Sequence, residues 1–177
     1  MTAAPAANPT TRISAIALLW VLAGLAGCGF GGLNFLQDKR LTITSPTDRE
    51  RVDLPVTVEW KVTDFRVTGE DGSRRTDSGF FGLYVDRAPQ PPGETQEFLV
   101  RDDQTCRRTP GCPDEAFLAQ RDIHTTTKTR FTIEFLRDLD PESSRRDFHE
   151  VTIVFLNGVG ERIGESAFTI QFEVARD

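Results

Sequence analysis

The chain has 177 residues, with 21 lysines and arginines against 27 aspartates and glutamates, for a formal net charge of −6. Hydrophobic residues make up 38% and charged residues 27% of the chain, which excludes collagen-like, coiled-coil and wholly disordered proteins. Only one apolar stretch approaches the length of a membrane span, so a multi-span membrane protein is excluded as well. The acidic balance argues against a nucleic-acid partner, because phosphate binding requires a basic surface.

The N-terminal region contains one apolar segment that predicts a targeting signal. Residues 13–25 form an apolar run that is shorter than the roughly 20 residues of a membrane span but has the length of a secretory signal core. The run ends in Leu25-Ala26-Gly27-Cys28. This segment resembles the bacterial lipoprotein signal peptide, whose lipobox is an aliphatic residue, two small residues and a cysteine. The resemblance implies a diacylglyceryl group on Cys28 and cleavage before it.

This interpretation divides the chain into a signal peptide (1–27), a lipidated cysteine with a flexible tether (28–38) and one domain (39–177). It predicts a lipid anchor in the cell membrane, with the domain on the extracytoplasmic side. The alternative is a transmembrane anchor over residues 13–33. Five glycines disfavour that helix, because each costs about 1 kcal/mol in a helix interior. They are Gly24, Gly27, Gly29, Gly31 and Gly32.

Residues 39–177 are predicted to form a single all-β domain, because apolar and polar side chains alternate with a period of two. Seven short strands are expected, at 41–43, 54–62, 80–85, 97–101, 131–135, 151–156 and 168–174. The segments 80–85 and 151–156 are apolar at nearly every position, which predicts central strands that are buried on both faces. One short helix is expected over residues 113–120, because a proline and acidic residues suit a helix start.

Two segments resemble bacterial Ig-like or fibronectin-III-like domains. Residues 43–58 contain Ser45-Pro46 and a Pro55-Val56 pair, similar to the first two strands of these domains. Residues 149–160, from a histidine to an Asn-Gly turn, are similar to the penultimate strand. The resemblance implies a single antiparallel β-sandwich of about seven strands. The antibody signature is absent from the sequence, because no cysteine pair brackets Trp60.

Cys106 and Cys112 are the only thiols left once Cys28 is lipidated. Outside the cytoplasm an even pair predicts a disulfide, and Pro110-Gly111 supplies a turn that can bring the two sulfurs together. The alternative is a redox or metal pair. Redox pairs usually have the spacing C-x-x-C, and a zinc site needs more ligands.

The remaining polar residues give no recognised catalytic or metal motif. His124 and His149 accompany no G-x-S-x-G elbow and have no metal-binding spacing. We interpret His149 as a corner residue that is hydrogen-bonded to nearby backbone. The acidic stretch 138–142 could hold Ca²⁺ but lacks an EF-hand pattern, and a solvated turn explains it more simply. Gly158 and Gly160 fit a hairpin turn.

Two functions from different classes remain. The first is a non-catalytic surface lipoprotein, a monomer without cofactor or metal, that acts as a binding or structural module of the cell envelope. Its partner would be an envelope protein or a polysaccharide. The second is an envelope enzyme or enzyme accessory that uses loop residues around Asp102, Asp103 and His124.

The candidate partner site is the 102–128 connection, at 27 residues the longest between the expected strands. The cysteine pair would order this connection and so reduce the entropy lost on binding. Arginine and aromatic side chains are common interface anchors. The candidate contact residues are Arg107, Arg108, Phe117, Arg121 and His124. Alternatively, the connection only caps the sandwich, with Phe117 and Leu118 turned into the core.

Overall fold

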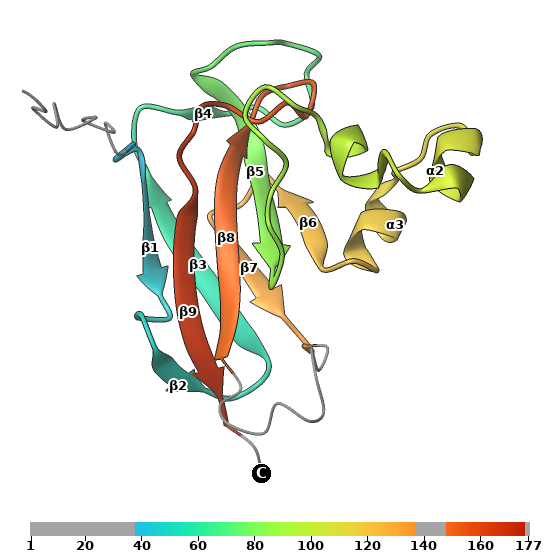
Figure 1. Ribbon diagram of the computed structural model, residues 1–177. Helices are drawn as coiled ribbons and strands as arrows, with labels where there is room; N and C mark the ends of the chain where they lie inside the picture. Colours follow the sequence, from blue (N-terminus) through green and yellow to red (C-terminus); the bar gives the residue numbers. More distant parts are fainter. Residues whose placement is uncertain (1–37, 137–147, 176–177) are drawn as a thin grey trace, which may run out of the picture. The chain divides into compact units, whose positions relative to one another are not determined.

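The computed structural model describes residues 38–136 and 148–175 (Figure 1). The signal peptide, Cys28 and most of the tether lie outside the described residues, as does the acidic stretch 138–142. Most of the regular secondary structure in the described residues is β-strand, with only short helices, so the prediction of an all-β domain is confirmed.

The strands form two sheets. The smaller sheet has the order β1-β3-β7 and is antiparallel, with β1 at Leu41–Ser45, β3 at Val56–Val62 and β7 at Arg130–Ile133. The larger sheet has the order β2-β9-β8-β5-β4, and β6 also pairs with β5. Its strands are β2 (Glu50–Val52), β4 (Arg66–Val67), β5 (Ser78–Val85), β6 (Ile123–Thr126), β8 (Phe148–Leu156) and β9 (Phe168–Val174).

The main core lies between the two sheets. Alternate residues of β3 point inward from the smaller sheet, and alternate residues of β5 and β8 meet them from the larger one. The rings of Trp60 and Phe81 pack in a T-shaped arrangement, with 5.3 Å between the ring centroids. Each of these side chains stabilises the fold by about 1.5–3 kcal/mol through burial. The inward residues include Val56, Val58, Trp60, Phe81, Leu83, Val85, Val151, Ile153 and Phe155.

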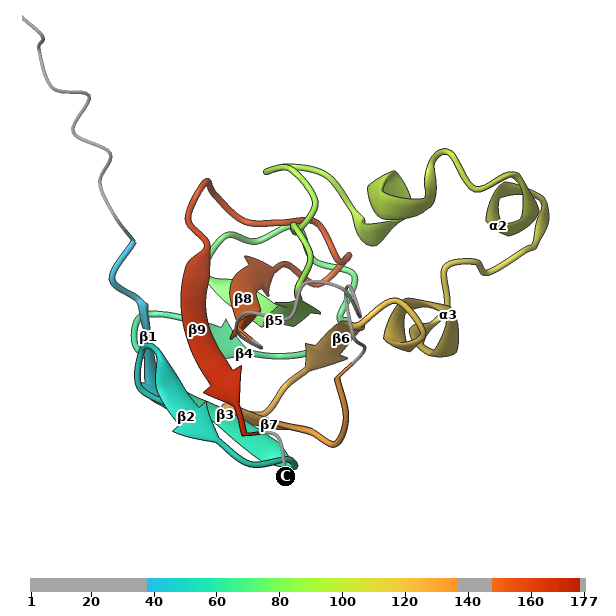
Figure 2. The same cartoon turned by 60° about the horizontal axis from the view of Figure 1, so that its bottom comes forward.

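A second core covers the outer face of the larger sheet. Phe80 and Tyr84 of β5, with Val154 and Leu156 of β8, pack there against Leu118 and Ile123. Residues 86–122, the helical segment, supply Leu118 and carry η2 (Gln96–Val100), α2 (Gln104–Arg108) and α3 (Glu115–Ala119). Figure 2 shows this segment on the side of the larger sheet that faces away from the smaller sheet. The prediction that β5 and β8 are buried on both faces is confirmed.

Three features of the predicted fold are wrong. Residues 97–101 form most of the 3₁₀ helix η2 rather than a strand, because Val100 is the only buried residue in η2 and no neighbouring strand pairs with it. A second α-helix, α2, accompanies the expected one, since the Asp103 carboxylate caps its first turn. The larger sheet is mixed rather than antiparallel, because β2 pairs in parallel with β9 and β4 with β5.

Other differences concern element bounds. The short strands β2, β4 and β6 were not expected, and β7 ends at Ile133 so that Phe135 is 67% exposed. The expected helix near residue 113 is present as α3. It begins at Glu115, since the Asp114 carboxylate accepts a hydrogen bond from the Phe117 amide at 2.7 Å.

Candidate functional site

The helical segment is cross-linked by the predicted disulfide. Cys106 of α2 is bonded to Cys112, with 5.2 Å between the two Cα atoms. Cys106 is buried, with 2% of its surface exposed. The bond therefore fixes the end of α2 to the residues that lead into α3.

A polar brace inside the segment involves Asp103, Phe117 and Arg121. One Asp103 carboxylate oxygen accepts from the Thr105 and Cys106 amides at 3.0 and 2.9 Å. The other accepts from the Arg121 guanidinium at 3.0 Å. This guanidinium also stacks over the Phe117 ring, 3.6 Å from its centroid. Asp103 thus links the start of α2 to the end of α3.

The structure divides the five candidate contact residues into separate groups. Arg107 and Arg108 are exposed on α2 and, with Gln104, line a hollow of about 330 Å³. Phe117 and Arg121 are half-buried members of the brace. The alternative is that the connection caps the sandwich with Phe117 and Leu118 turned into the core. Leu118 is indeed buried in the second core, whereas Phe117 is only half-buried.

His124 does not lie in a loop. It belongs to β6, where it pairs with Leu83 of β5 and stacks on Phe131, with 4.6 Å between the ring centroids. The predicted bounds of 102–128 are therefore wrong, because the long connection runs from β5 to β6 over residues 86–122. Burial lowers the pKa of His124, an effect that the nearby Asp122 and Glu115 only partly offset.

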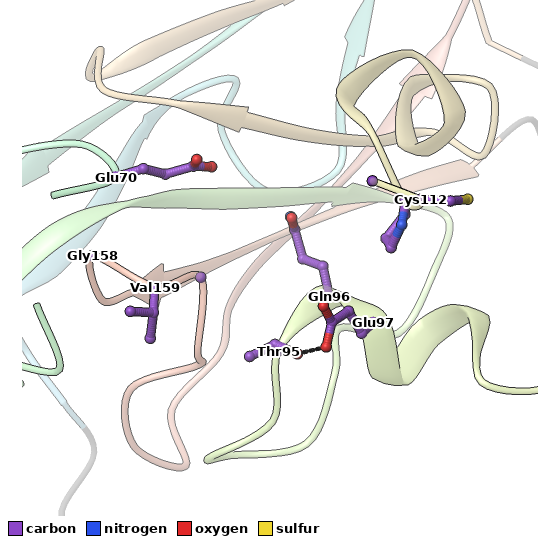
Figure 3. Close-up of a pocket in the computed structure, with 10 residues that line it drawn as sticks. Glu70, Thr95, Gln96, Glu97, Cys112, Gly158 and Val159 are labelled. Carbon is purple, nitrogen blue, oxygen red and sulfur yellow. Dashed lines mark hydrogen bonds between the residues drawn. The ribbon is translucent and has the colours of Figure 1, made fainter. Parts of the chain in front are cut away.

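A polar pocket lies beside the helical segment (Figure 3). Its volume is about 360 Å³. Four parts of the chain line it: the loop at Glu70, residues 95–97, residues 111–113 around the disulfide at Cys112, and the turn from Gly158 to Gly160. The Thr95 hydroxyl donates to the Glu97 carboxylate at 3.4 Å. The two carboxylates in its lining, Glu70 and Glu97, make this pocket suited to a group that donates hydrogen bonds or carries positive charge.

No single motif in the sequence indicates this pocket. Its lining residues are separated by up to 90 positions, from Glu70 to Gly160, and the sequence singles out only two of its segments: the Pro110-Gly111 turn before Cys112 and the glycine-rich turn. The structure confirms the glycine-rich turn, in which the Gly160 amide donates to the Asn157 carbonyl at 2.9 Å.

A buried polar network holds residues 88–93 beside this pocket. The Tyr84 hydroxyl is hydrogen-bonded to the side-chain carbonyl of Gln90, which is fully buried. The Gln90 backbone carbonyl accepts from the Arg162 guanidinium at 2.8 Å, and the Glu165 carbonyl accepts from the same guanidinium at 2.9 Å. Burial raises the pKa of Tyr84 and lowers the pKa of Arg162. Residues 88–93, which include three prolines, are therefore attached to the sheet rather than free in solvent.

His149 lies at a corner, as interpreted, but its partner is different. Its Nδ1 atom is hydrogen-bonded to a carboxylate oxygen of Asp86 at 2.7 Å, and the other oxygen accepts from the Glu150 amide at 2.7 Å. The expectation of a backbone partner is wrong, because the carboxylate follows directly after β5 and reaches the start of β8. Both side chains are about 10% exposed, so the pair closes this end of the core.

The residues of the enzyme alternative are not gathered in one cavity. Asp102 is exposed beside Arg101, Asp103 is part of the brace, and His124 is stacked in β6. None of the four hollows described along residues 38–136 and 148–175 is lined by His124 together with Asp102 or Asp103.

The lowered pKa of His124 predicts a dependence of stability on pH. The unfolded chain binds a proton near pH 6.5, whereas the folded chain resists protonation until a lower pH. The stabilising effect of the neutral ring is complete above about pH 6.5 and is lost as the pH falls through the folded-state pKa. Urea unfolding at about pH 8 and about pH 5.5 should therefore show a smaller loss of stability in His124→Gln than in the unmodified protein. An equal loss in both proteins would contradict this.

Comparison with known proteins finds no relative of this chain. No protein-family model, curated protein or solved structure matches the chain. In the described ranges, no helix has the length and apolar character needed to cross a membrane. Among the same residues, no group of three or more His, Cys, Asp or Glu side chains is arranged to hold a metal ion. The function is therefore inferred from the residues of this chain itself.

Proposed function

We propose that the chain is a non-catalytic lipoprotein, anchored in the cell membrane through Cys28, whose domain serves as a binding or structural module of the cell envelope. The Cys106–Cys112 disulfide is the observation that carries this proposal. Structural disulfides persist in oxidising compartments outside the cytoplasm and are rare inside it. The lipobox at residues 25–28 leads to the same compartment from an independent part of the chain.

The strand order supports an Ig-like sandwich. In that architecture one sheet contains the neighbours A, B and E, and the other contains G, F and C. The orders β1-β3-β7 and β9-β8-β5 correspond to these two sets. Two features depart from the antibody pattern. Trp60 lies on β3, which corresponds to strand B, whereas the antibody tryptophan lies on strand C, and the disulfide lies in the helical segment rather than between the sheets. The architecture alone leaves the function open, because it carries many activities.

The exposed end of the helical segment is the proposed contact with a protein partner. Arg107 and Arg108 lie together on α2 beside the disulfide, and in the described residues neither forms an ion pair. The disulfide and the brace around Asp103 order the segment before binding, which lowers the entropy cost. Two adjacent guanidinium groups fit a partner surface that presents carboxylates.

The enzyme alternative has less support. Asp103 accepts three hydrogen bonds within the segment, and His124 lies in β6, so neither is presented to a substrate in a shared cavity.

Lipidation is tested by labelling cells that produce the protein with a fatty-acid analogue. We expect the label on the unmodified protein and none on Cys28→Ala, which should also keep residues 1–27. Cys106→Ala/Cys112→Ala is the control, since it removes two thiols but leaves the lipobox intact. Equal labelling of Cys28→Ala and the unmodified protein would refute the anchor.

Partner binding is tested by pull-down from envelope extract with the full chain. Arg107→Ala/Arg108→Ala should reduce the recovery of the partner roughly tenfold, because an interface arginine commonly contributes more than about 1 kcal/mol. Arg51→Ala/Arg66→Ala removes the same charge from two exposed arginines outside the helical segment and should leave recovery unchanged. The same loss with both pairs would mean that net charge, and not α2, determines recovery.

A further inference from the structure

The outer face of the smaller sheet forms a second polar surface, on the opposite side of the sandwich from the helical segment (Figure 2). In β3 the residues Thr57, Glu59 and Lys61 alternate with buried or half-buried apolar side chains and so face outward. The register places Thr57 beside Thr132 and Glu59 beside Arg130 of β7, and Lys61 beside Thr42 of β1.

Two adjoining hollows run across this face, with volumes of about 610 and 440 Å³. Lys128 and Arg130 line both hollows, so the two form one surface, which we name the threonine–lysine groove. Threonine hydroxyls and basic groups dominate its lining. One hollow is lined by Thr44, Glu59, Trp60, Lys61 and residues 127–130. The other is lined by Thr57, Thr125, Thr126, Lys128 and residues 130–132.

The groove is cationic in an acidic protein. Lys61, Lys128 and Arg130 are exposed and, across the described residues, their side chains form no ion pair, while Glu59 is the only acidic residue of the lining. Two of the three lysines in the whole chain are in this groove. Threonine on an exposed strand follows from β propensity alone, but a concentration of unpaired cations in a chain of net charge −6 does not.

The groove is held in shape before any ligand arrives. The Trp60 amide of β3 donates to the Thr129 carbonyl at 3.0 Å, which attaches the turn between β6 and β7 to the sheet. The Lys128 amide donates to the Thr126 hydroxyl at 3.0 Å, and the hydroxyls of Thr57 and Thr132 are 2.9 Å apart. Because these groups are already ordered, a ligand loses little binding energy to rearrangement of the backbone.

We propose that the threonine–lysine groove binds an anionic, hydroxyl-rich polymer, either a polysaccharide that carries carboxylates or a polyol phosphate. The ammonium and guanidinium groups would pair with the anionic groups, and the threonine hydroxyls, which both donate and accept, match hydroxyls along the polymer. An acidic peptide would satisfy the cations but offers few partners for a row of hydroxyls. The proposal goes beyond the protein-binding role of α2, because it uses a different face.

Binding is measured by titrating the full chain, purified in detergent, with four probes at low salt. Oligogalacturonate supplies carboxylates, poly(glycerol phosphate) supplies phosphodiesters, dextran is the neutral control, and poly-L-glutamate carries charge without hydroxyls. We expect binding to at least one of the first two, weaker binding to poly-L-glutamate, none to dextran, and weakening with added salt. Whichever of the first two binds more tightly identifies the anionic group.

Variants locate the site. Lys61→Gln/Lys128→Gln/Arg130→Gln should weaken binding roughly tenfold, since three exposed ion pairs with the polymer are lost and each contributes modestly. Arg51→Gln/Arg66→Gln/Arg87→Gln makes the same charge change at exposed positions outside the groove and should bind as the unmodified protein does. Thr57→Val/Thr132→Val keeps the charge and should also weaken binding. Absence of binding to both anionic probes, equal binding to poly-L-glutamate or dextran, or equal losses in the two triple variants would overturn the proposal.

Discussion

Burial of β5 and β8 on both faces is the constraint on which the rest of the structure depends. Their inward residues, such as Phe81 and Ile153, pack against the smaller sheet, while Tyr84 and Leu156 point to the opposite side. An outer face made of large apolar side chains cannot remain in water. The helical segment exists in its observed position because it covers that face with Leu118, and Ile123 of β6 continues the cover.

The polar features of the helical segment follow from this covering role. Tyr84 is buried by the cover, so its hydroxyl requires a partner, which Gln90 provides. Gln90 is in turn held by Arg162, which connects the segment to the loop between β8 and β9. The pocket beside Gly158 and the exposed arginines of α2 are thus positioned by a packed layer. The threonine–lysine groove depends less on that layer, because most of it is formed on the smaller sheet and the turn before β7, and only Thr125 and Thr126 come from β6.

The strands that could be predicted are those long enough to show a clear apolar pattern in their own sequence. β3, β5, β8 and β9 have five or more residues with a clear apolar pattern, and all four were expected. β2 and β4 are only three and two residues long, and each forms because a neighbouring strand supplies hydrogen-bond partners. The prediction of a strand at 97–101 is wrong for the opposite reason. Phe98 and Val100 have the spacing of a strand, but no neighbouring strand pairs with this segment.

The sites were predictable only where they depend on local sequence. The disulfide follows from two cysteines six positions apart, with a turn between them. In contrast, Lys61 and Lys128 are brought together by the pairing of β3 with β7, and Asp86 reaches His149 through the pairing of β5 with β8. These contacts depend on which strands pair and in which register, and a single sequence does not determine either. The small number of lysines was the one signal that could have drawn attention to the groove.

The most direct test of this account is the urea unfolding of Leu118→Ala. Leu118 is 4% exposed and belongs only to the second core. If the helical segment is an integral layer of the fold, the free energy of unfolding should fall by about 2–5 kcal/mol in a single transition. Leu54→Ala is the control, since Leu54 is 37% exposed and should cost little. A loss below about 0.5 kcal/mol in Leu118→Ala would show that β5 and β8 do not need the cover, and would contradict the account.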